Sequence, residues 1–135
     1  MPATDDHWEQ ANHNRALAHE LIQNPMKYKD WAIVVAFYAA VHYIEAFRSD
    51  LDGSHSEDHH QRAKFVKRKT NNWAVRTAYE NLYQASRFLR YLEYKGMTKP
   101  PYGQWLPESD AKGHVTADLE SIARAMSGYT GKAVS

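Results

Sequence analysis

The feature that most constrains the fold is an almost uninterrupted apolar stretch at residues 31–47, WAIVVAFYAAVHYIEAF. Only His42 and Glu45 interrupt it. A helix that is apolar on nearly every side must be buried over most of its surface. A polar group inside such a helix therefore either finds a partner in the core or serves a function. We expect residues 31–47 to form a buried core helix.

Composition narrows the classes of protein to consider. Residues 31–47 reach only the short limit of the roughly 17–25 residues that span a membrane and contain a histidine and a glutamate, so no membrane association is expected. The 135 residues suffice for one domain with a hydrophobic core. A formal net charge of +1 means that nucleic-acid binding would need a local basic patch. The absence of cysteine excludes disulfides and thiolate sites and fits a cytoplasmic protein.

Helical signals are abundant along the chain, whereas strand signals are nearly absent. Helices are expected between Thr4 and Asn24 and over about 31–50, 56–69, 72–94 and 116–127. The expected N-terminal caps are Thr4, Asp30, Ser56 and Thr116, and the expected stops include Gly53 and Gly128.

These segments predict one all-α domain. Its core is an up-and-down four-helix bundle over about residues 5–94. A long loop rich in proline and glycine follows at 95–113, and a short fifth helix at about 116–127 is an accessory element. The tail from Tyr129 onward is expected to fray.

Two groups of polar residues are candidates for chemistry near the core helix. Tyr38 and His42 share a helix face, so they form either a polar relay or two core residues with ordinary partners. His55 and His59 have a spacing that can chelate a divalent metal in a helical turn. Solvated histidines are the alternative, and no HExxH pattern is present, so we expect neither a metal nor another cofactor.

A basic stretch follows the histidines. Five bases lie within eight residues: Arg62, Lys64, Lys67, Arg68 and Lys69. They either bind phosphate groups or form a solvent-exposed helix face beside an acidic turn. Imidazole beside guanidinium suits metal-free RNA cleavage, because one group moves a proton and the other stabilises negative charge on phosphate.

A tyrosine–arginine surface is expected on the helix at 72–94, formed by Tyr79, Tyr83, Arg87, Arg90 and Tyr91. It either stacks bases, binds a partner chain, or forms ion pairs within the molecule.

Three segments together resemble a HEPN-type (higher eukaryote and prokaryote nucleotide-binding) domain. They are YKDWAIVVAFYAAVHYIEAF, SHSEDHHQR and YENLYQASRFLRYL. The resemblance implies a four-helix up-and-down bundle, usually dimeric, of the kind used in toxin–antitoxin, antiviral and RNA-processing systems. Active members cleave RNA without metal through an Arg-x(4–6)-His motif completed across a dimer, and Arg48-x6-His55 matches it here, with the polar Ser49 after the arginine.

The resemblance and the residues together predict a metal-independent endoribonuclease of a toxin–antitoxin or defence system. His55 or His59 would move protons, Arg48 and Arg62 would stabilise phosphate charge, and other bases would bind RNA: Lys64, Lys67, Arg68, Lys69, Arg87 and Arg90. The expected partners are RNA, a second copy of the chain, and a cognate antitoxin or other protein. The alternative is a non-catalytic helical module that dimerises or binds a partner protein. A metal-dependent hydrolase is disfavoured, because the apolar helices lack paired Glu and Glu-x-x-His ligands.

Overall fold

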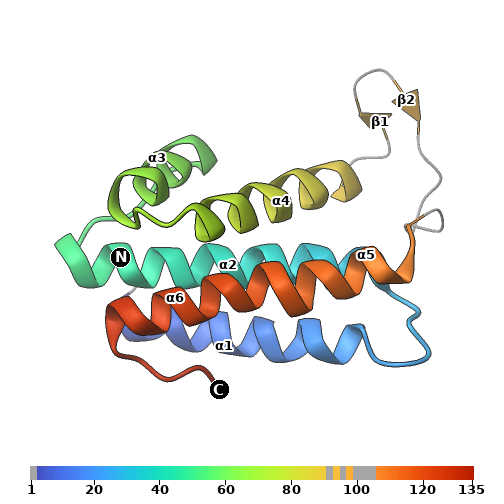
Figure 1. Ribbon diagram of the computed structural model, residues 1–135, viewed down its shortest axis with the longest axis horizontal. Coiled ribbons are helices and arrows are strands. Elements are labelled where there is room, and N and C mark those ends of the chain that lie inside the picture. Colours follow the sequence, from blue (N-terminus) through green and yellow to red (C-terminus); the bar gives the residue numbers. More distant parts are fainter. Residues whose placement is uncertain (1–2, 91–92, 95–96, 99–105) are drawn as a thin grey trace.

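The computed structural model describes residues 3–90, 93–94, 97–98 and 106–135, and almost all of these are helical (Figure 1). The elements in chain order are α1 (Thr4–Leu21), α2 (Lys29–Asp52), α3 (His59–Lys69), α4 (Trp73–Arg90), β1 (Glu93–Tyr94), β2 (Met97–Thr98), α5 (Glu108–Gly113), the π-helical η2 (His114–Leu119) and α6 (Glu120–Thr130). The predicted all-α class is confirmed.

A small antiparallel hairpin of β1 and β2 lies where the sequence predicted the end of a helix and the start of a loop. Tyr94 pairs with Met97, and Glu93 pairs with Thr98. The helix expected over 72–94 therefore does not reach residue 94, because strand pairing uses the backbone groups that a further helical turn would need.

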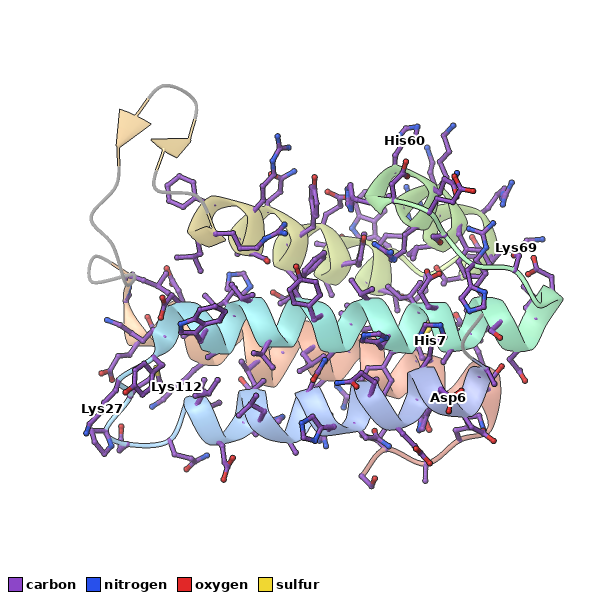
Figure 2. The ribbon with its side chains drawn as sticks, turned by 180° about the vertical axis from the view of Figure 1, so that it is seen from behind. Asp6, His7, Lys27, His60, Lys69 and Lys112 are labelled. Carbon is purple, nitrogen blue, oxygen red and sulfur yellow. The ribbon has the colours of Figure 1, made fainter. Side chains whose placement is uncertain are left out.

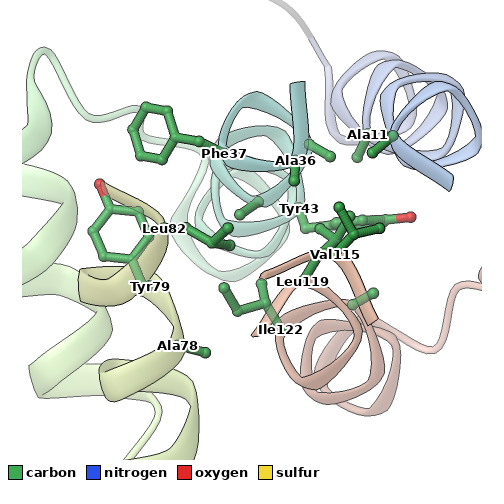
Figure 3. Packing of buried hydrophobic residues seen from close by; sticks show 14 of the residues in the cluster. Ala11, Ala36, Phe37, Tyr43, Ala78, Tyr79, Leu82, Val115, Leu119 and Ile122 are labelled. Atoms are coloured by element: carbon green, nitrogen blue, oxygen red, sulfur yellow. The ribbon is translucent and has the colours of Figure 1, made fainter. Parts of the chain in front are cut away.

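The core helix is α2, which packs against α1 along its length and also contacts α4, η2 and α6. Figure 3 shows Tyr43 of α2, Leu82 of α4 and Leu119 of η2 in one packed cluster. The predicted burial of residues 31–47 is confirmed for most positions, although Trp31 and Tyr38 are exposed. By length and composition α2 could cross a membrane, but 67% of its most apolar window is buried inside the molecule, as expected of a core helix.

The C-terminal segment differs most from the prediction. α5, η2 and α6 follow one another without a break in helical backbone, so residues 108–130 form one helical segment. Thr116, expected to be a cap, lies inside it and donates its hydroxyl to the Lys112 carbonyl at 2.6 Å. Gly128 does not stop the helix, which ends at Gly131 in the left-handed conformation (φ 75°). The long loop therefore ends at residue 107, and a short accessory helix at 116–127 is wrong.

Burial explains this difference, because the segment carries an apolar stripe that packs into the core. The buried positions at three- and four-residue steps are Ala111, Val115, Leu119, Ile122 and Met126. The long helices that lie side by side are α1, α2, α4 and the C-terminal segment, with the shorter α3 beside the start of α4 (Figure 1). Within the predicted loop, residues 95–96 and 99–105 lie outside the described part.

The ends of the helices are only partly as expected. Gly53 ends α2 in the left-handed conformation (φ 73°), as predicted. The cap of α3 is Asp58, not Ser56, and its carboxylate accepts the Gln61 backbone N–H at 2.8 Å. Thr4 and Asp30 lie inside their helices and are not caps.

The C-terminal tail does not fray. The Trp8 indole donates to the Ala133 carbonyl at 2.8 Å, and Lys132 forms an ion pair with Asp5. The Tyr129 hydroxyl donates to the Thr70 carbonyl at 2.9 Å. These contacts hold the tail against α1 and against the end of α3.

Candidate functional site

The buried acid of the core helix, Glu45, organises the polar interior next to α3. It is 4% exposed. One carboxylate oxygen accepts the Ser56 backbone N–H at 2.6 Å, and the other accepts Nε of Arg62 at 3.1 Å. A carboxylate removed from water needs such partners to offset the loss of hydration. The carboxylate of Glu45 therefore holds two parts of the chain against α2: the turn before α3, through Ser56, and the inner face of α3, through Arg62.

The same network continues to α4 through the hydroxyl of Tyr79. This hydroxyl lies 3.5 Å from a terminal nitrogen of Arg62 and 2.8 Å from Nδ1 of His59. Burial raises the pKa of Tyr79 to about 12, against the opposing effect of Arg62, so its proton stays on at neutral pH.

His59 is a neutral imidazole in this setting. Burial, with Arg62 as a secondary cause, lowers the pKa of His59 to about 4. Its ring stacks on Tyr83 with centroids 3.3 Å apart and planes 4° apart. At neutral pH such a group can accept a proton only weakly.

Arg48 braces the turn between α2 and α3. Its guanidinium donates to the hydroxyls of Ser54 (2.9 Å) and Ser56 (3.0 Å) and lies 5.0 Å from the Phe65 ring centroid. The matched Arg48-x6-His55 motif thus places both residues at one turn, where Arg48 holds the two residues that flank His55.

His55 belongs to a second group of histidines, which we call the histidine cluster: His7, which is buried, and His42 and His55, which are half-buried. The ring of His55 lies 4.9 Å from that of His7. Nδ1 of His7 lies 3.0 Å from Nδ1 of His42, a hydrogen bond in which one ring must donate. Figure 2 shows His7, which belongs to α1, against α2. Three ring nitrogens, Nε2 of His7 and both of His55, are buried without a hydrogen-bond partner among the described residues.

The structure separates two residues that the sequence pairs. The spacing of His55 and His59 predicts a metal-chelating pair only if both lie in one helical turn. Because α3 begins at His59, His55 lies outside the helix. His55 consequently contacts His7, while His59 contacts Tyr79 and Tyr83. In the described residues no group of three or more His, Cys, Asp or Glu side chains is placed to hold a metal ion. Likewise His42 bonds to His7, whereas Tyr38 accepts a hydrogen bond from Arg90 at 3.3 Å.

The outer side of α3 carries the basic residues predicted to bind RNA. Lys64, Lys67, Arg68 and Lys69 are all exposed. Figure 2 shows His60 projecting from the same helix. Lys64 and Lys67 line a groove of about 240 Å³ between α3 and α4, together with His60, Arg76, Tyr79 and Glu80 and two apolar side chains.

The groove continues into a neighbouring hollow that shares Arg76 and Glu80 with it. Trp73 forms part of this hollow and is 73% exposed. The Arg76 guanidinium lies 5.0 Å from the Trp73 ring centroid. A basic groove therefore adjoins an exposed aromatic ring.

The remaining predicted RNA contacts lie farther along α4. Arg87 is exposed, and its charge contributes to lowering the pKa of His59. Arg90 lies over the rings of Phe37 and Tyr38, at 5.7 and 6.0 Å from their centroids. Its guanidinium thus contacts side chains of α2, although Arg90 is an exposed residue.

In comparisons with known proteins, no family model, curated protein or solved structure matches this chain. The likeness to HEPN-type domains rests on the sequence motifs alone.

The sequence did not single out Glu45 or His7 as site residues, and it suggested Tyr79 only as part of a tyrosine–arginine surface. Glu45 was visible as the acid within an apolar helix, and that signal is sufficient to suspect a buried ion pair. His7 and Tyr79 gave no local signal of their roles, because their partners are 35 residues away (His42) and 20 residues away (His59).

Proposed function

We propose that this chain is a cytoplasmic, HEPN-like, RNA-associated protein that binds single-stranded RNA along the groove between α3 and α4. The observation that supports this most is the joining of that basic groove to the exposed ring of Trp73. The proposal includes an up-and-down four-helix arrangement, but with the C-terminal segment as the fourth long member in place of the helix predicted at 56–69.

Charge on α3 supports RNA as the ligand. The helix contains no acidic residue from His59 to Lys69. Arg62 is neutralised by Glu45, whereas Lys64 and Lys67 form no ion pair with any described residue. Uncompensated lysines beside a groove attract a phosphate backbone and displace its counterions.

The aromatic ring supports a single strand over a duplex. Unpaired bases stack on exposed aromatic side chains, while a basic groove follows the backbone. Trp73 supplies such a platform, and Arg76 beside it can hold a phosphate or extend the stack.

A second candidate function is metal-independent cleavage of RNA in a toxin–antitoxin or defence system. The hydrogen bonds of Arg48 to Ser54 and Ser56, the residues on either side of His55, favour it. In the single chain, however, the nitrogens of His55 are buried and Arg48 is bonded to two serines. Cleavage would thus require a homodimer, or an antitoxin-controlled rearrangement, to expose this pair.

The test is binding and cleavage of a labelled single-stranded RNA, with EDTA present. The binding variant is Lys64→Gln/Lys67→Gln, and the matched control is Lys27→Gln/Lys112→Gln, which removes two lysines far from α3 (Figure 2). We expect weaker binding in the first variant only. Equal binding by both variants would reject the groove as the RNA site.

Cleavage in the same samples decides between the two candidates. Product that is lost in both His55→Ala and Arg48→Ala would establish the ribonuclease. Binding without product supports the non-catalytic RNA-binding module. No RNA binding by the wild-type chain would contradict both, and would favour a module for protein partners.

A further inference from the structure

The histidine cluster contains polar atoms that the proposed RNA site does not use. His7 is 7% exposed and lies on the second turn of α1. Its Nε2 and both ring nitrogens of His55 are buried without a partner among the described residues. A buried polar atom without a partner opposes folding, because it has lost its hydrogen bonds with water. Three such atoms in one place indicate a contact that is weak enough to open when conditions change.

We propose that the histidine cluster is an acid-sensitive latch, which holds the first turns of α1 against α2 and the turn at residues 54–56 and opens when His7 and His42 both take up protons.

The hydrogen bond between His7 and His42 explains why protons would open it. The two Nδ1 atoms are 3.0 Å apart, so one must carry a hydrogen and the other must accept it. One added proton can be tolerated, because one charged ring can still donate. Two imidazolium rings carry hydrogens on both Nδ1 atoms, so the bond is lost and two like charges face each other.

The surrounding charges do not offset this repulsion. The groups that act on His7 are Asp6 on α1, Glu45 on α2, Arg62 on α3 and His55 in the turn. Glu45 is already bonded to Arg62 and to Ser56, and Arg62 adds positive charge. Burial is the main cause that lowers the pKa of both His7 and His42, with a neighbouring histidine second.

Opening would stay local, because few other contacts join the start of α1 to this turn. Thr4 donates to the hydroxyl of Ser49 at 3.0 Å. Asp5 and Trp8 make polar contacts with the C-terminal tail, not with this turn, and the rest of α1 packs along α2. The helices farther away, α4 and α6, contain no member of the histidine cluster. Local opening with a folded remainder is a common low-energy event in proteins.

Amide hydrogen exchange of the full chain, read by peptide at pH 7.5 and pH 5.0 and corrected for intrinsic rates, tests the latch. We expect protection over residues 4–12 to fall by at least about tenfold at pH 5.0 in the wild type. The change over residues 75–90 follows the titration of His59 and should be the same in the wild type and in His7→Gln. His7→Gln should lose less than about threefold over the same interval, because glutamine does not titrate. The control His13→Gln, an exposed histidine on the same helix, should behave like the wild type.

His42→Gln provides a second variant if His7→Gln fails to fold, and the same reduced loss is expected. Unchanged protection of residues 4–12 in the wild type at pH 5.0 would overturn the latch. So would an equal loss in the wild type and in both glutamine variants. A thermal stabilisation by zinc that EDTA reverses, and that both variants abolish, would also overturn it, because the unpaired nitrogens would then serve a metal.

Discussion

The inner and outer faces of α3 carry positive charge in opposite situations. On the inner face, Arg62 is 12% exposed and pairs with Glu45, so its charge is balanced inside the protein. On the outer face, Lys64 and Lys67 are exposed at a groove and form no ion pair with a described residue. Basic residues close in sequence can therefore have different roles. The inner charge of Arg62 stabilises the fold, and the outer charges of Lys64 and Lys67 are available to a ligand.

The largest expected effect comes from breaking the inner pair. Arg62→Met leaves Glu45 charged, buried and without its ionic partner, so we expect a loss of about 3–5 kcal/mol in the free energy of unfolding. Urea denaturation measures it. The double variant Glu45→Met/Arg62→Met should recover most of the loss, because no unpaired charge remains. If the double variant is as unstable as the single one, the unpaired charge is not the cause.

The next largest effect is a pH dependence of the free energy of unfolding, caused by the titration of His59. Its pKa is about 4 in the folded chain and 6.5 ordinarily, so below pH 6.5 the unfolded chain takes up a proton that the folded chain does not. Its contribution to stability is therefore complete above pH 6.5 and is lost as the pH falls toward 4. We expect about 2 kcal/mol less stability at pH 5.0 than at pH 7.5 from this group.

Urea midpoints of the wild type and His59→Gln at the two pH values measure this difference. The variant should show a flatter dependence, while His60→Gln, an exposed neighbour, should keep the wild-type slope. Equal slopes in the wild type and His59→Gln would mean that His59 is readily protonated in the folded chain.

On the outer face, removal of the exposed ring should weaken RNA binding and leave the fold intact. Trp73→Ala deletes a side chain that is 73% exposed, so little core packing is lost. Stacking of one base is worth about 1–3 kcal/mol, which predicts roughly 5- to 150-fold weaker binding of a single-stranded RNA. Fluorescence anisotropy measures it, with Trp31→Ala, another exposed tryptophan, as the control. An equal effect of the two variants would remove Trp73 from the proposed site.

The smallest effect is expected for the hydroxyl that links the inner pair to α4. Tyr79→Phe removes the partner of His59 and of Arg62 but keeps the buried ring, so we expect a loss of about 1–2 kcal/mol. Chemical denaturation measures the loss. Although the ring of Tyr79 lines the groove, its hydroxyl bonds to His59 and Arg62 inside the protein, so RNA affinity should stay unchanged. A change in affinity without a change in stability would place this hydroxyl in the binding site.

Sequence patterns predicted the fold best where burial is uniform. The apolar run of α2 identified the core helix, and Gly53 identified its end. The stripe from Ala111 to Met126 is equally regular, yet its first turns adjoin a region rich in proline and glycine, and Gly113 lies within it. Local composition therefore indicated a loop, while burial against α2 and α4 made it a helix.

The candidate site was harder to predict, because tertiary contacts decide what each polar residue does. Glu45 could be suspected from its apolar surroundings, but Arg62, 17 residues away, could not be identified as its partner. His55 and His59 looked like one cluster in the sequence. The start of α3 at His59 divides them between two different polar groups.

The most direct test of the central claim is the salt dependence of RNA binding by the outer face of α3. A plot of log affinity against log salt, with a labelled single-stranded RNA and EDTA, gives a slope of about −0.7 for each phosphate contact. For Lys64→Gln/Lys67→Gln the slope should be shallower than that of the wild type by about 1.4, with Lys27→Gln/Lys112→Gln unchanged. Identical slopes and affinities in all three proteins would contradict the claim that this face binds RNA.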